Sequence, residues 1–104
     1  MDELIEGIES TIISLMRYDL NEYPKQAQEL ANKMMVIFPA IIDCYNDPLM
    51  QDKREDAMYW PGQLERILAA FDRGDAFEVT DVLYNETRAN LMELKAILTQ
   101  RGLI

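Results

Sequence analysis

Nine consecutive residues near the middle of the chain carry neither a charge nor a hydrogen-bonding side chain. They run from Met34 to Ile42 and read Met-Met-Val-Ile-Phe-Pro-Ala-Ile-Ile. A helix that is apolar all round must be surrounded by other elements or covered by a partner. We therefore expect this stretch to form the central helix of a compact helical domain, or else a docking surface for another protein.

Length and charge limit what the chain can do. Its 104 residues suffice for one hydrophobic core and not for two, so residues 1–104 are predicted to form a single domain. Ten basic and nineteen acidic residues leave a net charge of -9, which repels phosphate backbones and anionic lipids. Nucleic acid and membrane surfaces are therefore not expected as partners.

The cysteine content and the apolar runs indicate a location. Cys44 is the only cysteine, which excludes an internal disulfide and is typical of a reducing compartment. The chain starts Met-Asp-Glu-Leu-Ile-Glu, with acids where a secretory signal would be basic. The longest apolar run falls well short of the roughly 20 residues that span a bilayer. The predicted location is cytoplasmic.

Apolar spacing and helix-stop residues predict four helices. The first carries an apolar stripe at three- and four-residue spacing from Leu4 to Met16. The second runs from about Pro24 to Tyr45 and is expected to be kinked near Pro39. The third begins after a stop at Asn46-Asp47-Pro48. It is expected in two pieces, broken near Trp60-Pro61.

The last helix has the clearest boundary signals. Gly74 suits the left-handed residue that ends the preceding helix, and Asp75 with Glu78 forms a variant of the capping box. The predicted helix runs from Asp75 to Arg101. Thr87 and Asn90 interrupt its apolar face and need hydrogen-bond partners if they are buried. With short turns and no strand-like alternation, the chain is predicted to be all-α, as a four-helix up-down bundle.

The residue types needed for most catalysis are missing. The chain has no histidine, which removes the usual zinc ligand and general base, and its four glycines stand singly, so no phosphate-binding loop is present. Carboxylates alone could still bind magnesium. A helical magnesium-dependent phosphohydrolase is therefore the alternative hypothesis, with Asp75, Glu78, Asp81 and Glu86 as its site; Glu6, Glu9, Asn85 and Glu93 are further candidates. Helix capping by Asp75 and Glu78 and an ordinary solvated helix face explain these acids better than a metal site does, and no cofactor is predicted.

Several large apolar residues lie off the predicted core stripes. Phe77 and Tyr84 are seven residues apart on the last helix, and Ile13 and Leu20 show the same offset on the first. They either broaden the core contacts or form a surface for a partner helix or a second copy of the chain. Tyr59 and Trp60 are a further candidate anchor, unless Trp60 packs inside the break. Seven methionines favour adaptable apolar contacts.

One segment resembles a known group of proteins. Phe71-Asp72-Arg73-Gly74-Asp75, followed by Val79, Asp81, Leu83 and Glu86, resembles a stretch of small uncharacterised helical proteins of Gram-positive bacteria. The resemblance covers about residues 71–86 and implies a bacterial, cytoplasmic protein. The small, acidic, four-helical design is also similar to bacterial export chaperones of the flagellar type, although a fold does not fix a function.

These patterns together favour a non-catalytic protein-protein interaction module. It is expected to bind itself as a homodimer, or to bind an amphipathic helix of a client protein as a chaperone or adaptor does. The acidic surface would favour a basic partner.

Overall fold

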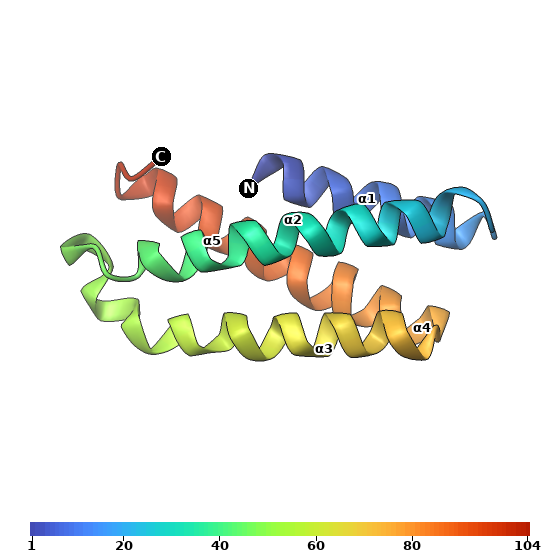
Figure 1. Cartoon of the computed structure of the whole chain (residues 1–104). Helices are drawn as coiled ribbons and strands as arrows, with labels where there is room; N and C mark the ends of the chain where they lie inside the picture. The colour runs from blue at the N-terminus through green and yellow to red at the C-terminus, as the bar shows by residue number, and fades with distance from the viewer.

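The computed structural model describes residues 1–104 and contains helices and turns but no strand, so the all-α prediction is confirmed. The helical segments join end to end into four rods that lie along a molecule of 45 × 21 × 21 Å (Figure 1). In chain order the rods are α1 (Asp2–Met16), α2 (Glu22–Cys44), η1 (Pro48–Met58) with α3 (Tyr59–Arg73), and α4 (Ala76–Thr80) with η2 (Asp81–Arg88) and α5 (Ala89–Gln100). None of the helices combines the length and apolar character needed to cross a membrane.

Contacts between rods place the first and last segments side by side. Helix α1 packs against α2 and η2, and α2 packs against α3 and η1. An ion pair joins Asp2 to Lys95, and another joins Glu9 to Arg88 at 3.1 Å. Because the numbers rise along α1 as they fall along η2 and α5, these two rods run antiparallel. The turn after α1 and the turn after α3 lie at one end of the molecule (Figure 1).

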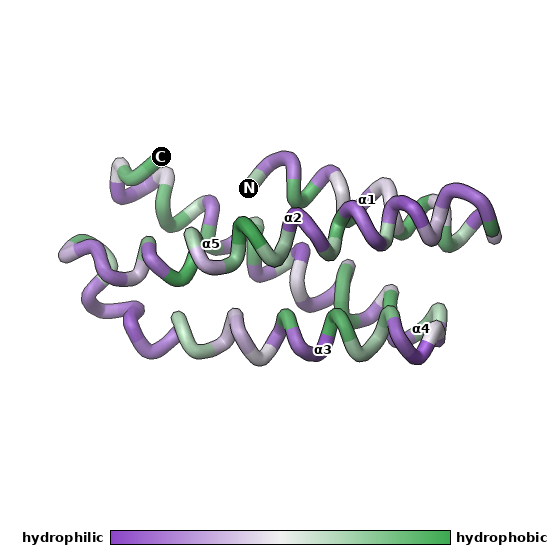
Figure 2. The backbone as a smooth tube through the Cα atoms, viewed as in Figure 1, coloured by the Kyte–Doolittle hydropathy of each residue, from purple (hydrophilic) through white to green (hydrophobic).

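The core is one cluster to which every rod contributes apolar residues at helical spacing, and Figure 2 shows these positions recurring between hydrophilic ones. Phe38 is 1% exposed and Trp60 is 2% exposed, and the two rings meet edge to face with centroids 5.5 Å apart. The other members of the cluster are Leu4, Ile8, Ile12, Leu30, Met34, Ile41, Tyr45, Met50, Ile67, Ala70, Val79, Val82, Leu83, Leu91, Leu94 and Leu98.

The apolar run in α2 is enclosed on one side only. Met34, Phe38 and Ile41 are buried, whereas Met35 is 58% exposed and Val36 is 75% exposed. The expectation that this run forms a central helix surrounded by its neighbours is therefore wrong, and the alternative, a docking surface for another protein, stays a prediction. In an arrangement of four rods each rod keeps an outward face, and the composition of α2 does not change that geometry.

Two proline-containing segments differ in how they are accommodated. Helix α2 remains helical on both sides of Pro39, which lies inside it. In the third rod the 3₁₀ helix η1 gives way to the α-helix α3 between Met58 and Tyr59, two residues before Pro61. Pro61 is then the third residue of α3, where a backbone N–H has no acceptor within the helix, so its missing donor breaks nothing. The change of helix type therefore precedes the Trp60-Pro61 pair.

The last rod is not one uniform α-helix. Gly74 ends α3 with φ of +70°, and the Asp75 carboxylate accepts hydrogen bonds from the N–H groups of Phe77 (2.9 Å) and Glu78 (3.3 Å), so Asp75 caps α4 as predicted. The predicted capping box is not complete, because the Glu78 carboxylate pairs with Arg73 instead of the Asp75 N–H. Between Asp81 and Arg88 the backbone is a π-helix, η2. The sequence analysis did not predict this segment.

Candidate functional site

Four of the residues predicted to meet a partner are exposed. Phe77 is 90% exposed, Leu20 86%, Ile13 49% and Tyr84 40%. The Phe77 and Leu20 side chains are too open to solvent to broaden the core contacts of their helices. The first of the two explanations given for their positions is therefore wrong. Ile13 belongs to α1, Leu20 to the turn after it, Phe77 to α4 and Tyr84 to η2.

The two ion pairs between α1 and the last rod set their register. The step from Asp2 to Glu9 matches the step from Lys95 back to Arg88, seven residues in each case. Ile13 lies four residues beyond Glu9 on α1, and Tyr84 lies four residues before Arg88 on η2. The Arg88 guanidinium also lies 4.7 Å from the centroid of the Tyr84 ring, a cation-π contact that orients this ring. Ile13, Leu20 and Tyr84 do not line the groove that lies beyond the Glu9–Arg88 pair on the seam between the rods, whereas Phe77 does.

Beyond the Glu9–Arg88 pair the seam opens into a groove at the end of the molecule, which we call the end groove. Its apolar walls come from segments about 60 residues apart in sequence, with exposed Met16 and Tyr18 on one side and exposed Phe77 on the other. Tyr18 adopts a left-handed backbone with φ of +54°, which is unusual for a residue with a side chain. The groove is lined by Leu15, Met16, Tyr18, Ala76, Phe77, Glu78, Thr80, Asp81 and Asn85.

The charges in the end groove are all negative. Its two charged lining residues are Glu78 and Asp81. Glu78 is paired with Arg73, whose hydrogen bonds lower the pKa of its carboxyl below the ordinary value. Asp81 accepts a hydrogen bond from the Asn85 amide at 3.1 Å and has no basic partner. The groove is therefore apolar with an acidic edge.

Tyr59 and Trp60 lie elsewhere and do not form part of this surface. Trp60 is 2% exposed, and its indole N–H donates to the Tyr45 hydroxyl at 3.0 Å. It is a core residue, so it cannot be the surface anchor that was one of the two predictions for it. Tyr59 is half-buried, and its hydroxyl accepts a hydrogen bond from Asn90 at 2.7 Å, which supplies the partner that Asn90 was predicted to need.

The acids of the magnesium hypothesis do not gather at one point. Asp75 caps α4, Glu78 is paired with Arg73, and Glu86 is paired with Arg66. No group of three or more histidine, cysteine, aspartate or glutamate residues could hold a metal ion. Each of these three carboxylates therefore has a structural role that accounts for its place in the sequence.

A magnesium titration tests this interpretation. We expect millimolar MgCl₂ to leave the thermal midpoint of the protein unchanged beyond what the same ionic strength of NaCl produces, because no cluster of oxygen ligands is present to bind the ion. Differential scanning calorimetry of the native chain and of Asp81→Ala measures this. A stabilising shift with MgCl₂ that Asp81→Ala abolishes would restore the phosphohydrolase hypothesis.

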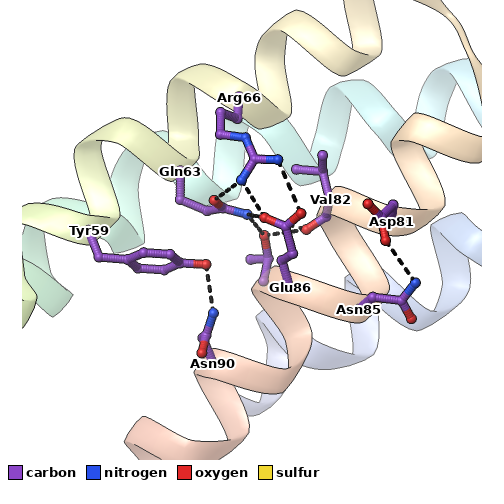
Figure 3. A network of polar contacts seen from close by, with 9 residues as sticks. Tyr59, Gln63, Arg66, Asp81, Val82, Asn85, Glu86 and Asn90 are labelled. Atoms are coloured by element: carbon purple, nitrogen blue, oxygen red, sulfur yellow. Dashed lines mark hydrogen bonds and ion pairs between the residues drawn. The ribbon is translucent and has the colours of Figure 1, made fainter.

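A buried polar network that was not predicted from the sequence joins α3 to η2 (Figure 3). Gln63, which is 2% exposed, donates through its amide to the Thr87 hydroxyl at 2.9 Å and to the Val82 carbonyl at 3.3 Å. The Thr87 hydroxyl in turn donates to the Val82 carbonyl at 2.7 Å, a reach of five residues that follows the wider π turn. Arg66 pairs with Glu86 at the outer edge of the network.

Every polar side-chain atom buried in the molecule has a hydrogen-bond partner. The network therefore holds α3 against η2 without leaving any buried polar side-chain atom unpaired. The signal for it was present in part, since Thr87 interrupts an apolar face, but nothing in the sequence paired Thr87 with Gln63 across 24 residues.

Comparisons with protein-family models, with curated proteins and with solved structures find no match for this chain.

Proposed function

We propose that the protein is a non-catalytic interaction module whose end groove binds an amphipathic helix of another protein. The observation that carries the proposal is the convergence of Met16, Tyr18 and Phe77 on one groove while all three side chains remain exposed. Exposed apolar groups that gather in one place are typical of binding surfaces, whereas scattered ones are ordinary.

The left-handed backbone at Tyr18 closes the C-terminus of α1. The Tyr18 N–H donates to the Leu15 carbonyl and the Asp19 N–H donates to the Ser14 carbonyl, both at 3.1 Å, which is the pattern of a Schellman motif. This helix end fixes where the Tyr18 ring leaves the backbone, and the ring itself stays 83% exposed at the groove.

Charge favours a basic partner over a second copy. The charged groups that line the groove are carboxylates, and each copy of the chain has a net charge of -9. Two such surfaces repel each other, whereas an amphipathic helix with lysine or arginine beside its apolar face matches both the groove and its edge. A homodimer through the same groove remains the alternative.

A pair of substitutions tests the groove and the residue next to it, because Phe77 lines the groove and Tyr84 precedes Asn85, which also lines it. We expect Phe77→Ala with Tyr84→Ala to leave the unfolding midpoint nearly unchanged and to weaken binding of a helical leucine-lysine peptide by roughly tenfold or more, since buried aromatic residues are the usual anchors of such contacts. Isothermal titration calorimetry measures the affinity, and a leucine-glutamate peptide of the same length tests the charge argument.

The matched control is Leu49→Ala with Met58→Ala, which removes two exposed apolar side chains outside the groove. This control variant should bind as the native chain does. If the native chain binds neither peptide, the proposal fails. If it dimerises in sedimentation experiments and Phe77→Ala with Tyr84→Ala abolishes the dimer, the occupant is a second copy. Severe unfolding of that variant would place both rings in the interior.

We further propose that the four rods form an up-down bundle, that Pro39 bends α2, and that the protein works in the cytoplasm. The antiparallel ion pairs between α1 and the last rod support the first of these. The missing N–H of Pro39 in mid-helix supports the second. The lone, half-buried and free Cys44 supports the third.

A further inference from the structure

The outward side of α2 carries an apolar stripe that no rod of the molecule covers. Val36, Pro39 and Ala40 are exposed, and the last two follow Val36 by three and four residues, so all three share one face of the helix. Met35 beside them is also exposed. The contacts of α2 with α1, α3 and η1 leave these four residues open, and we call them the α2 face.

Two opposite charges bracket the α2 face. Lys33 lies three residues before Val36 and Asp43 lies three residues after Ala40, and both are exposed. Neither of them forms an ion pair within the chain. Asp43 also lies in the last turn of α2, where the helix dipole disfavours a carboxylate and no basic residue compensates for it. The bracketed face therefore has no net charge, and both of its charges lack a partner.

We propose that two copies of the chain associate through the α2 face as an antiparallel dimer with two-fold symmetry. Two α2 helices that cross antiparallel at the level of Phe38 bring together residues that lie equally far before and after Phe38. Lys33 of each copy then meets Asp43 of the other, because both lie five residues from Phe38. Val36 meets Ala40 in the same way, a larger side chain against a smaller one.

The bracketing charges decide the orientation and the occupant. A parallel pair of helices would set Lys33 against Lys33 and Asp43 against Asp43, which is repulsive. The end groove carries only carboxylates and repels a second copy, whereas the α2 face offers one charge of each sign and is complementary to itself. Because both copies use the same face, the assembly closes at two members. The dimer does not depend on the function proposed for the end groove.

The dimer is expected to be weak. The contact is limited to one face of one helix in each copy, and small interfaces are typical of transient association. Sedimentation velocity of the full chain over a concentration series up to about 1 mM should therefore show a monomer that passes into a dimer. Val36→Ser should weaken the dimer roughly tenfold or more, because it removes apolar contact on both sides of the two-fold axis.

An exchange of the two charges tests the pairing directly. Lys33→Asp and Asp43→Lys should each weaken the dimer roughly fivefold or more, because like charges then meet at both ends of the contact. The two substitutions together restore opposite charges at both ends and should recover the native affinity. Asp43→Lys lowers the negative charge of the chain, so a weaker dimer in that variant cannot come from general repulsion between copies.

The matched control is Lys25→Asp, which makes the same change of charge as Lys33→Asp at another exposed position of α2. Lys25 lies so far before Phe38 that the partner helix ends before it reaches that level, because α2 ends at Cys44. This variant should dimerise nearly as the native chain does. All the substituted positions are exposed, and far-UV circular dichroism verifies that each variant folds.

The proposal is overturned if the chain stays monomeric throughout the series, if the double exchange does not recover the dimer, or if Lys25→Asp weakens it as much as Lys33→Asp does. A dimer that is abolished by Phe77→Ala with Tyr84→Ala and not by Lys33→Asp would also overturn it, because that dimer forms through the end groove. A native dimer that does not bind the leucine-lysine peptide would overturn only the proposed function.

Discussion

Replacing Phe38 with alanine is expected to lower the free energy of unfolding by about 3 to 5 kcal/mol, a large part of the stability of a domain of this size. The ring is 1% exposed and packs edge to face on Trp60, so its removal leaves a cavity at the centre of the core. Urea denaturation followed by circular dichroism measures the loss, and the emission of Trp60 should change as its neighbour disappears.

The control for this experiment lies on the same helix. Val36 is 75% exposed two residues away, so Val36→Ala should change the unfolding free energy by about 0.5 kcal/mol or less. Equal effects of the two substitutions would mean that α2 does not face the core as described. A small effect of Phe38→Ala alone would mean that the site collapses around the missing ring.

The second large effect is expected at the buried polar network. Thr87→Val keeps the shape of the side chain but removes the acceptor for the Gln63 amide, which is left with the longer contacts to Val82 and Glu86. A buried donor with a weakened partner should cost about 1 to 3 kcal/mol of stability, measured by urea denaturation.

Two further variants separate the hydrogen bond from other causes. Adding Gln63→Leu to Thr87→Val removes both partners, so the double variant should lose less stability than the sum of the single changes. Thr99→Val is the control, because the Thr99 hydroxyl donates to the Lys95 carbonyl at 2.8 Å but is exposed. Strict additivity of the Gln63 and Thr87 changes would show that the two side chains are not coupled.

Much of the fold could be predicted from local patterns. The stripe from Leu4 to Met16, the Asp47-Pro48 start and the Gly74-Asp75 boundary correspond to observed helix limits, because capping and periodicity act over a few residues. The enclosure of α2 could not be predicted, because the number of rods that surround a helix depends on the whole fold. The apolar composition of α2 shows that its burial would be favourable, but it does not show how many neighbouring helices cover it.

The spacing of buried residues in the sequence is consistent with the π-helix, although the π-helix was not predicted. The buried residues Val79, Leu83, Thr87 and Leu91 follow one another at intervals of four. In an α-helix each such interval turns the side chain by about 40° from the previous one, so three intervals would carry Leu91 about 120° away from Val79. The wider turn of η2 offsets this rotation, so the buried residues from Val79 to Leu91 all stay on the side that faces the core.

Candidate site residues were predictable to different degrees. Phe77, Tyr84, Ile13 and Leu20 were selected because they lie off the core stripes, and all four are exposed. Met16 was assigned to the core stripe, yet it is 70% exposed and lines the end groove. It is the last residue of α1, and whether a terminal residue reaches the core depends on how the partner rod ends, which no local pattern specifies.

The outward side of α2 affects how copies of this chain can associate. Met35 and Val36 present a second apolar surface on a different rod from those that form the end groove. If one copy placed this side of α2 in the groove of the next, each copy would still offer one free surface, and such head-to-tail contacts add members without closing a ring. The charge of -9 carried by every copy opposes that open-ended growth, so high salt, which screens it, is the condition under which polymers of this chain would form.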